Sequence, residues 1–402
     1  MGQLTTTEAA AVEVAGAQPM LAQVEAWALV NSGSRNLEGL SDVAALLSDA
    51  FAALPGKLDF RDPAPVEAVD AAGKKFAIEH GRNLHLVVRP DAPVQLLLTG
   101  HYDTVFGADH AFQSLTWLEP GVLGGPGVAD MKGGLAVMLA ALTALEASAH
   151  AAQLGYEVVL NSDEELGSPG SSALIAQAAR GKRAALTYEP AALPDGTLAG
   201  SRPGSGNFSF VIAGRSAHAG RNPEDGRNAV VAAADLALRL AKGKGPRLSV
   251  NVARVDGGGP NNVVPDSAVL RVNLRPATLE DQARAQSLID AAVTMAAAEH
   301  EVAIHVHGGF ARPPKPMHGE AEKLFGLVKQ AGADLGQMIN WQPTGGVCDG
   351  NNIAACGVPV VDTMGVRGGN IHSMEEYLIV ESLAERAALS ALTLLRLAGG
   401  AA

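Results

Sequence analysis

An alternation of apolar strands and amphipathic helices is the feature that most constrains how this chain can fold. The continuous apolar runs at Val94–Leu98, Tyr156–Leu160 and Ala184–Thr187 have the length and composition of buried strands. Between them, Met131–Leu145 and Ser172–Ala179 place apolar residues at helical spacing. Strands separated by helices pair in parallel through right-handed crossovers. The pattern therefore predicts an α/β fold with a mostly parallel sheet that is sandwiched by helices.

A different pattern lies between residues 204 and 312. Its elements follow the order strand, helix, strand, strand, helix, strand, which is typical of a ferredoxin-like α+β domain. The strands are expected at Asn207–Ala213, Leu248–Val255, Ala268–Leu274 and Val302–His307, and the helices at Arg227–Leu240 and Leu279–His300.

The α/β pattern occupies the chain on both sides of this segment. Helices are expected at Met20–Leu29 and Val43–Leu54 before it, and at Glu320–Gly332 and Glu381–Ala398 after it. The strand Val358–Asp362 lies between the last two helices. We therefore expect a catalytic domain in two parts, residues 1–203 and 313–402, with residues 204–312 inserted as a second domain.

The composition excludes several classes of function. The formal net charge is −12 and there is no basic run, so phosphate neutralisation, the main driving force for nucleic-acid binding, is absent. No apolar stretch reaches the ~18 residues that span a bilayer, and the first residues lack the regions of a signal peptide. Cys348 and Cys356 show no disulfide framework. We expect a cytoplasmic protein that binds neither nucleic acid nor membrane.

Histidines and carboxylates follow the predicted strands at the points where each strand ends. Ligands bind outside the carboxyl ends of the strands in open parallel sheets, so these side chains are expected to converge. They lie in five segments: His101-Tyr102-Asp103, Gly127-Val128-Ala129-Asp130, Asp163-Glu164-Glu165, Tyr188-Glu189-Pro190 and Asn370-Ile371-His372. Two imidazoles with three to five carboxylates suit two adjacent divalent metals and leave one carboxylate to act as a base.

Each segment taken alone has a simpler interpretation. Asp130 stands where a helix N-cap is expected, before Met131–Leu145, and Glu164 and Glu165 could form an acidic turn. The coincidence of five such segments favours a two-metal hydrolase over these interpretations. The chain has neither the G-x-S-x-G motif of serine hydrolases nor a Walker motif.

Several of these segments resemble the motifs of the co-catalytic metallopeptidases of the M20 family. The resemblance is carried by His101-Tyr-Asp103, Gly127-Val-Ala-Asp130-Met-Lys-Gly-Gly134, Asp163-Glu-Glu-Leu-Gly167, Tyr188-Glu-Pro190, Ser216-Ala-His218-Ala-Gly220 and Gly369-Asn-Ile-His372-Ser. It covers essentially the whole chain and is nearest to the glutamate carboxypeptidase (carboxypeptidase G) branch. It implies a zinc-peptidase-like catalytic domain with an inserted dimerisation or lid domain.

The resemblance also implies a role for each site residue. Asp130 would bridge two metals, His101 and Glu189 would complete one site, and Glu165 and His372 would complete the other. Asp103 would orient His101, and Glu164 would be the general base. His218 would reach across a homodimer to stabilise the oxyanion, and the Asp130–Met131 peptide would be cis. The metals are expected to be Zn, with Co and Mn as alternatives.

Substrate recognition is expected to involve the inserted domain. The resemblance implies that Asn262 and Arg275 bind the substrate's α-carboxylate and that Arg312 selects a glutamate side chain. The backbone of Gly345 and Gly346 offers further donors, and Arg202 is another candidate.

Three functions compete. The first is a carboxypeptidase that releases a C-terminal amino acid of the glutamate type from a small molecule or short peptide. The second is an M20-type deacylase or aminopeptidase acting on N-acyl amino acids or short peptides. The third, a dimeric binding protein without activity, is disfavoured because Glu164 and all five ligands are present.

Overall fold

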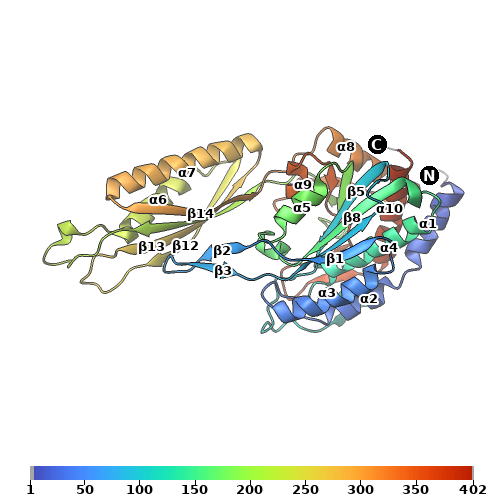
Figure 1. Cartoon of the computed structure of the whole chain (residues 1–402), viewed down its shortest axis with the longest axis horizontal. Helices are drawn as coiled ribbons and strands as arrows, with labels where there is room; N and C mark the ends of the chain where they lie inside the picture. Colours follow the sequence, from blue (N-terminus) through green and yellow to red (C-terminus); the bar gives the residue numbers. More distant parts are fainter. Residues whose placement is uncertain (1–3, 401–402) are drawn as a thin grey trace.

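The computed structural model describes residues 4–400 and shows an elongated molecule with two unequal halves (Figure 1). The larger half contains both ends of the described chain, and the smaller half is built from residues 205–312. The outermost residues of the two predicted catalytic segments, 1–3 and 401–402, lie outside the described residues. So does the start of the N-terminal segment on which the predicted localisation depends.

A six-stranded sheet forms the centre of the larger half, in the order β1-β4-β8-β5-β9-β16. Strands β8, β5, β9 and β16 run parallel to one another, whereas β4 pairs with β8 and β1 pairs with β4 in antiparallel fashion at one edge. The bounds are β1 (Lys57–Arg61), β4 (Asn83–Val88), β5 (Val94–His101), β8 (Leu154–Asn161), β9 (Ala184–Thr187) and β16 (Val360–Val361). The predicted mostly parallel sheet is confirmed, with an antiparallel edge that was not predicted.

Helices cover both faces of this sheet, and β5 shows why. Leu96 and Leu98 pack into one apolar core and Leu97 packs into the other, so the strand is buried on both sides. The first core is formed with α1 (Thr6–Gly16), α2 (Met20–Ala28), α3 (Leu37–Phe51), α4 (Gly134–Glu146), α8 (Glu320–Asp334) and α10 (Glu381–Ala398). The second is formed with α5 (Ser172–Ala179) and α9 (Asp349–Ala355).

One segment, Val128–Glu146, has the length and apolar composition of a bilayer-spanning helix. However, 94% of its apolar window is buried inside the protein, as expected for the central helix of a core.

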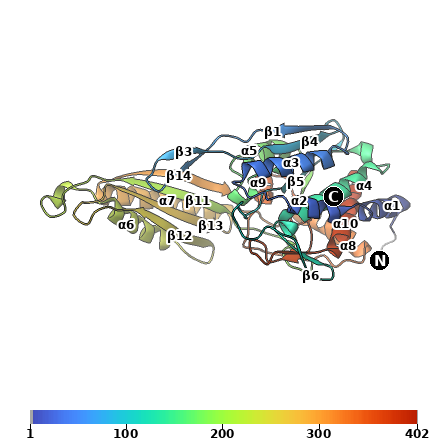
Figure 2. The ribbon, with the colours of Figure 1, turned by 90° about the horizontal axis from the view of Figure 1, so that it is seen from below.

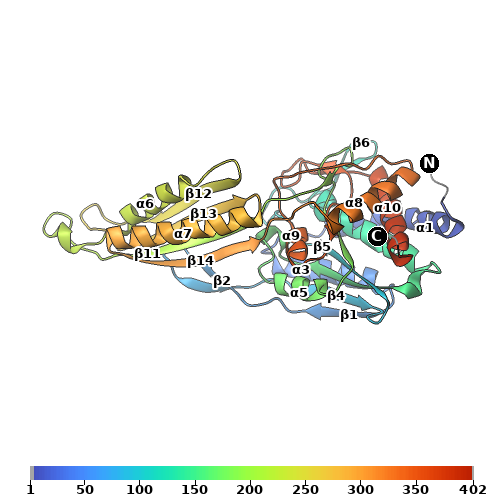
Figure 3. The ribbon, with the colours of Figure 1, turned by 90° about the horizontal axis from the view of Figure 1, so that it is seen from above.

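The smaller half is a four-stranded antiparallel sheet with two helices on one face (Figure 3). The strands follow the order β12-β13-β11-β14 and the pattern β-α-β-β-α-β along the chain, as predicted for a ferredoxin-like unit. The bounds are β11 (Ser205–Ala213), α6 (Ala229–Ala241), β12 (Leu248–Gly257), β13 (Ser267–Pro276), α7 (Leu279–His300) and β14 (Ala303–Arg312). We refer to this half as the insert.

A hairpin from the larger half reaches the other face of the insert sheet (Figure 2). It consists of β2 (Val66–Val69) and β3 (Lys75–Ile78), which were not predicted. Near its tip, Gly73 adopts a positive φ of 82° and packs so closely on Val211 that a Cβ would lie 2.6 Å from a methyl carbon. Arg271 Nη2 donates to the carbonyl of Val69 at 3.1 Å.

A second, small antiparallel sheet of the larger half was also not predicted. Its order is β17-β18-β7-β6, with bounds β6 (Thr116–Glu119), β7 (Val122–Gly124), β17 (Gly368–Gly369) and β18 (Tyr377–Ile379). Strands β10 (Leu198–Ala199) and β15 (Trp341–Gln342) form a separate parallel pair. The small sheet matters here because the loops that follow β7 and β17 carry two of the predicted site residues.

Candidate metal centre

Side chains from two sheets meet at the carboxyl ends of the central strands. His101 is the last residue of β5, Glu165 follows β8 and Glu189 follows β9. Asp130 and His372 come from the loops after β7 and β17 of the small sheet. The structure thus brings together all five residues that were predicted as metal ligands.

Asp130 lies at the centre of this cluster, between the two histidines. Its Oδ1 is 3.1 Å from His101 Nε2 and its Oδ2 is 3.3 Å from His372 Nε2. Glu189 Oε2 lies 3.6 Å from His101 Nε2, and Glu165 Oε2 lies 3.1 Å from His372 Nε2. Each histidine is therefore grouped with one outer carboxylate, and Asp130 is shared between the two groups.

Two of these residues are positioned differently from the prediction. Asp130 does not cap a helix, because α4 begins at Gly134 and the preceding turn holds Asp130 at φ −113° with its carboxylate directed to the histidines. The Asp130–Met131 peptide is cis, as the resemblance implied. His372 does not follow the predicted main-sheet strand but β17, at φ 63°.

A buried carboxylate that the sequence did not reveal holds the Asp130 loop in place. Glu376 accepts hydrogen bonds from the backbone N–H groups of Gly127, Ala129 and Asp130 at 3.0–3.1 Å. Glu376 is the residue just before β18. Its side chain is buried, and this burial raises its pKa to about 7. In sequence it resembles its exposed neighbour Glu375, so no local signal distinguishes the two.

Asp103 connects His101 to the loop that follows β8. Its Oδ1 lies 3.3 Å from His101 Nδ1 and accepts the N–H of Glu164 at 3.1 Å. Its Oδ2 accepts the N–H of Glu165 and the hydroxyl of Ser34. A proton on Nδ1 directed to this carboxylate and to the Asp103 carbonyl leaves the Nε2 lone pair free for a metal.

Burial and mutual repulsion control protonation in the cluster. Burial raises the pKa of Glu165 and of Glu189 to about 8, and repulsion by the Asp130 carboxylate adds to both shifts. Hydrogen bonds to Asp130 and Glu165 raise the pKa of His372 to about 11. At neutral pH the metal-free cluster therefore holds protons in positions that divalent cations would otherwise take.

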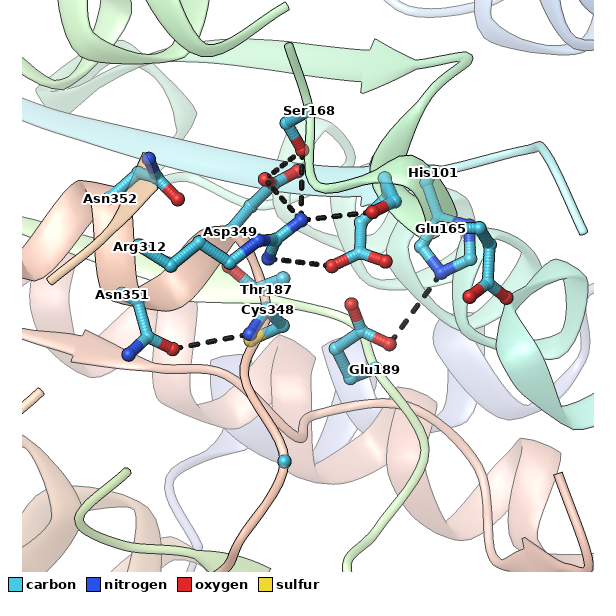
Figure 4. Close-up of polar contacts among 12 residues, drawn as sticks. His101, Glu165, Ser168, Thr187, Glu189, Arg312, Cys348, Asp349, Asn351 and Asn352 are labelled. Atoms are coloured by element: carbon cyan, nitrogen blue, oxygen red, sulfur yellow. Dashed lines mark hydrogen bonds and ion pairs between the residues drawn. The ribbon is translucent and has the colours of Figure 1, made fainter. Parts of the chain in front are cut away.

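The carboxylate of Glu164 lies beside His101 and Glu189 and forms an ion pair with Arg312, whose contacts with Ser168 and Asp349 are drawn in Figure 4. Its Oε1 lies 2.7 Å from Nη1 of Arg312, the last residue of β14. Arg312 Nη2 donates to the backbone carbonyl of Glu164 and to the Ser168 hydroxyl, both at 3.0 Å, and lies 3.5 Å from Asp349. Burial raises the pKa of Glu164, and the guanidinium opposes that shift. Arg312 is thus paired with the predicted base, although it also lines the cavity described below.

The donor set fits two divalent ions. Donor atoms of His101, Asp130 and Glu165 lie within 4.8 Å of one another, and so do those of His101, Glu164 and Glu189. Neutral imidazoles and carboxylates are the ligands that zinc and similar ions take in co-catalytic sites. Without cations the cluster brings four buried or half-buried carboxylates together, an arrangement that is costly unless charge is compensated.

The comparison with known families agrees with this chemistry. The model of peptidase family M20/M25/M40 matches residues 97–396. The chain belongs to this family. Metallopeptidases of the M20 family use a two-metal site and hydrolyse amide bonds, so the chain is an amide-bond hydrolase.

Two curated M20 relatives illustrate the range of related activities. Carboxypeptidase G2 of Pseudomonas sp. (strain RS-16) is 33% identical over 338 residues, which cover 81% of this chain and 80% of the relative. Succinyl-diaminopimelate desuccinylase of Xanthomonas oryzae pv. oryzae (strain PXO99A) is 29% identical over 338 residues, covering 78% and 87%. Among solved structures, a tripeptidase from Staphylococcus aureus superposes with a TM-score of 0.71 at 22% identity, covering 94% and 98% of the two chains, which shows the shared fold.

A cavity of about 740 Å³ connects the cluster of predicted metal ligands to the insert. Its lining includes Asp130, Glu164, Glu165, Glu189 and His372 on one side and residues of the insert sheet on the other. Arg275 lines the insert side, where its Nη1 donates to the carbonyl of Gly345 at 2.9 Å.

Arg202 and the two glycines, which were predicted to contact substrate, make contacts within the chain. Arg202 lies in the cavity wall but pairs with buried Asp362 through Nε at 2.8 Å and Nη2 at 3.3 Å. Its Nη1 donates to the carbonyl of Gly346 at 3.2 Å. Gly345 and Gly346 thus serve as acceptors for arginines through their carbonyls.

Two predicted site residues lie outside this cavity. His218 is exposed on the loop after β11, and the bridge between His218 and Val263 joins this loop to the one after β12. Asn262 lies on that second loop, where its carbonyl accepts the N–H of Ala219 at 2.9 Å. Neither residue is in the lining of the cavity of its own chain.

Proposed function

We propose that the chain is a two-metal carboxypeptidase that hydrolyses an amide bond and releases the C-terminal amino acid. One observation carries the proposal: a cavity with the metal cluster and Glu164 on one wall has a single unpaired cation, Arg275, on the other. Among residues 4–400, no carboxylate pairs with Arg275, whose Nη2 has no partner there. A guanidinium in this position suits the α-carboxylate of a leaving amino acid.

The distances within the cluster support a role for each ligand. Asp130 would bridge the two ions, with His101 and Glu189 on one and Glu165 and His372 on the other. When bound, the ions supply Lewis acidity that polarises the scissile carbonyl and makes a water acidic near neutral pH. Zinc is the expected metal, with cobalt and manganese as alternatives.

Glu164 would carry the proton through the reaction. Its carboxylate faces the cluster and would accept a proton from the attacking water, then donate it to the departing amine. Its bonds to Arg312 and the contact of its backbone with Asp103 fix its position. Burial raises the pKa of Glu164 above its ordinary value. The raised pKa lies closer to the range that suits proton transfer at neutral pH.

The positions of His218 and Asn262 support the proposal that the protein acts as a homodimer. Both lie on loops of the insert away from the cavity of their own chain, so a role at the site requires a second copy. In such a dimer His218 would donate to the carbonyl oxygen as negative charge develops there, and Asn262 would contact the substrate.

A deacylase of the M20 type is the second candidate, favoured by the similarity to succinyl-diaminopimelate desuccinylase. A kinetic panel distinguishes the two. The zinc-loaded protein should be given amides with one acyl group and varied C-terminal residues, then one C-terminal residue with varied acyl groups. The carboxypeptidase proposal expects kcat/KM to depend mainly on the C-terminal residue and to fall when its carboxylate is amidated. Strict dependence on the acyl group alone would favour the deacylase.

A further inference from the structure

Three asparagines form a row across the insert sheet where it faces the cavity. Asn273 of β13 is the register partner of Asn251 on β12 and of Asn207 on β11. Paired residues on neighbouring strands project from the same face, and all three line the cavity. On β14 the row continues at Gly309, where a Cβ would meet nothing within 4 Å. The row is therefore a strip of carboxamides with open space at one end.

Hydrogen bonds orient this row from Arg275 outward. Arg275 Nε donates to Asn273 Oδ1 at 3.1 Å, and Asn273 Nδ2 donates to Asn207 Oδ1 at 2.8 Å. Asn273 Nδ2 also reaches the Ser205 hydroxyl at 3.1 Å. These bonds fix which end of the amide is nitrogen in Asn273 and in Asn207. Within residues 4–400, Asn207 Nδ2 and the whole Asn251 carboxamide are left without a hydrogen-bond partner, so the row offers both donors and acceptors to a ligand.

The charges of the cavity limit what this row can accept. Among the arginines of the lining, Arg202 is paired with Asp362 and Arg312 with Glu164, so Arg275 is the cation that remains for a substrate. One guanidinium matches one carboxylate. A second carboxylate at the row would lose its hydration without gaining a counterion. A neutral carboxamide would meet donors and acceptors together.

We propose that Asn207, Asn251 and Asn273 form a subsite for the side chain of the released residue and that they select an uncharged carboxamide, as in glutamine, over the carboxylate of glutamate. The subsite lies beside Arg275 on the same strand face, where the side chain of a residue held by its α-carboxylate would point along the row. This inference rests on the proposed function, and it names the class of amino acid released.

The test compares N-acyl amino acids that share one acyl group and end in glutamine, glutamate or methionine. Methionine matches glutamine in length but has no hydrogen-bonding amide. For the zinc-loaded full chain, kcat/KM should favour glutamine over both by about tenfold, the effect of one or two net hydrogen bonds. In Asn207→Leu the ratio of glutamine to methionine should fall to about one. Ser209→Ala, on the same strand face but outside the cavity lining, should keep the wild-type ratio.

A binding measurement separates this inference from the proposed function. Calorimetric titration of the metal-free full chain with N-acetylglutamine and N-acetylglutamate should show the same preference for the amide without any turnover. If nothing in the panel is hydrolysed but the binding preference holds and is lost in Asn207→Leu, the proposed function is wrong and the subsite stands. Equal or better use of glutamate by wild-type protein, or a ratio unchanged in Asn207→Leu, overturns the subsite.

Discussion

The guanidinium of Arg312 lies 2.7 Å from Oε1 of Glu164, although 148 residues separate the two in the chain. Arg312 is the last residue of the insert, and Glu164 stands beside the metal cluster. The residue at which the chain leaves the insert therefore holds the proposed catalytic base directly. Both side chains are buried, so the pair is little weakened by solvent.

Removal of the guanidinium should impair both stability and turnover. In Arg312→Met, Glu164 and Asp349 would keep buried charges without their partner, and we expect a loss of about 3 kcal/mol in unfolding free energy. Turnover should fall by at least about tenfold because the base loses its fixed position. Arg312→Lys keeps the charge but loses the planar guanidinium fork. Its unfolding free energy and its turnover should therefore lie between those of Arg312→Met and of the wild type. Denaturant unfolding and kcat measure both effects, with exposed Arg254→Met as control; a fully active, stable Arg312→Met would contradict the role.

Glu164 and its neighbour Glu165 should respond differently to the same substitution. Glu164→Gln is expected to retain two metal ions per chain and to lose turnover by a factor of about 10²–10⁴, the contribution of a general base. Glu165→Gln should lose metal first, as should Asp130→Ala. Metal analysis of the purified variants, together with kcat, distinguishes the roles. Near-normal activity in Glu164→Gln would show that another group transfers the proton.

Glu376 should be needed for metal binding although it is not itself expected to touch a metal. Glu376→Gln places an amide N–H among the three backbone donors that now share a carboxylate, so the loop that carries Asp130 should loosen. We expect metal affinity to fall by about 10–100-fold, as for other residues that orient ligands. Competition with a chelator measures this, and Glu375→Gln is the matched exposed control. Equal affinities of the two variants would rule out the positioning role.

Metal binding should release protons. In the metal-free protein the pKa values of Glu165 and Glu189 are raised to about 8 and that of His372 to about 11, so these groups hold protons at pH 7. Cations must displace those protons, and affinity should therefore weaken as the pH falls from 9 to 6. Calorimetry in buffers of different ionisation enthalpy should count more than one proton released per chain at pH 7. Binding that is independent of pH would contradict the assigned ligands.

The proposed dimer predicts complementation between inactive variants. If His218 acts on the partner's site, a random mixture of His218→Ala and Glu164→Gln chains, unfolded and refolded together, should regain about a quarter of wild-type activity, because half the dimers are mixed and each has one complete site. Each variant alone should remain inactive or slow with unchanged metal content. No gain on mixing would place the role of His218, if any, within its own chain.

Segments with a clear apolar pattern were predictable, and two-residue strands that lack one were not. Ala184–Thr187 and Leu279–His300 match β9 and α7 residue for residue, because their apolar spacing and the Thr278 N-cap act locally. A two-residue strand such as Gly368–Gly369 has no period to detect. Its absence from the prediction led His372 to be assigned to the wrong strand.

The site residues also differ in whether their positions could be predicted from the sequence. His101 and Glu189 were found because the ends of parallel strands share one edge of a sheet. The pairing of Arg312 with Glu164 was not found, because it depends on how the insert lies against the larger half. The residues around Arg312 in the sequence do not indicate how the two halves pack. The resemblance assigned Arg312 to the substrate instead.

The hairpin of β2 and β3 gives the insert a third attachment besides the two points where the chain enters and leaves it. Its tip covers Val211 and Val269, and Val269 is completely buried although it projects from the sheet face opposite the helices. An insert transplanted into another scaffold without residues 62–80 would expose this apolar patch to water. Deletion of the insert would in turn leave the hairpin with nothing to rest on. For protein engineering, the two halves therefore form one inseparable unit.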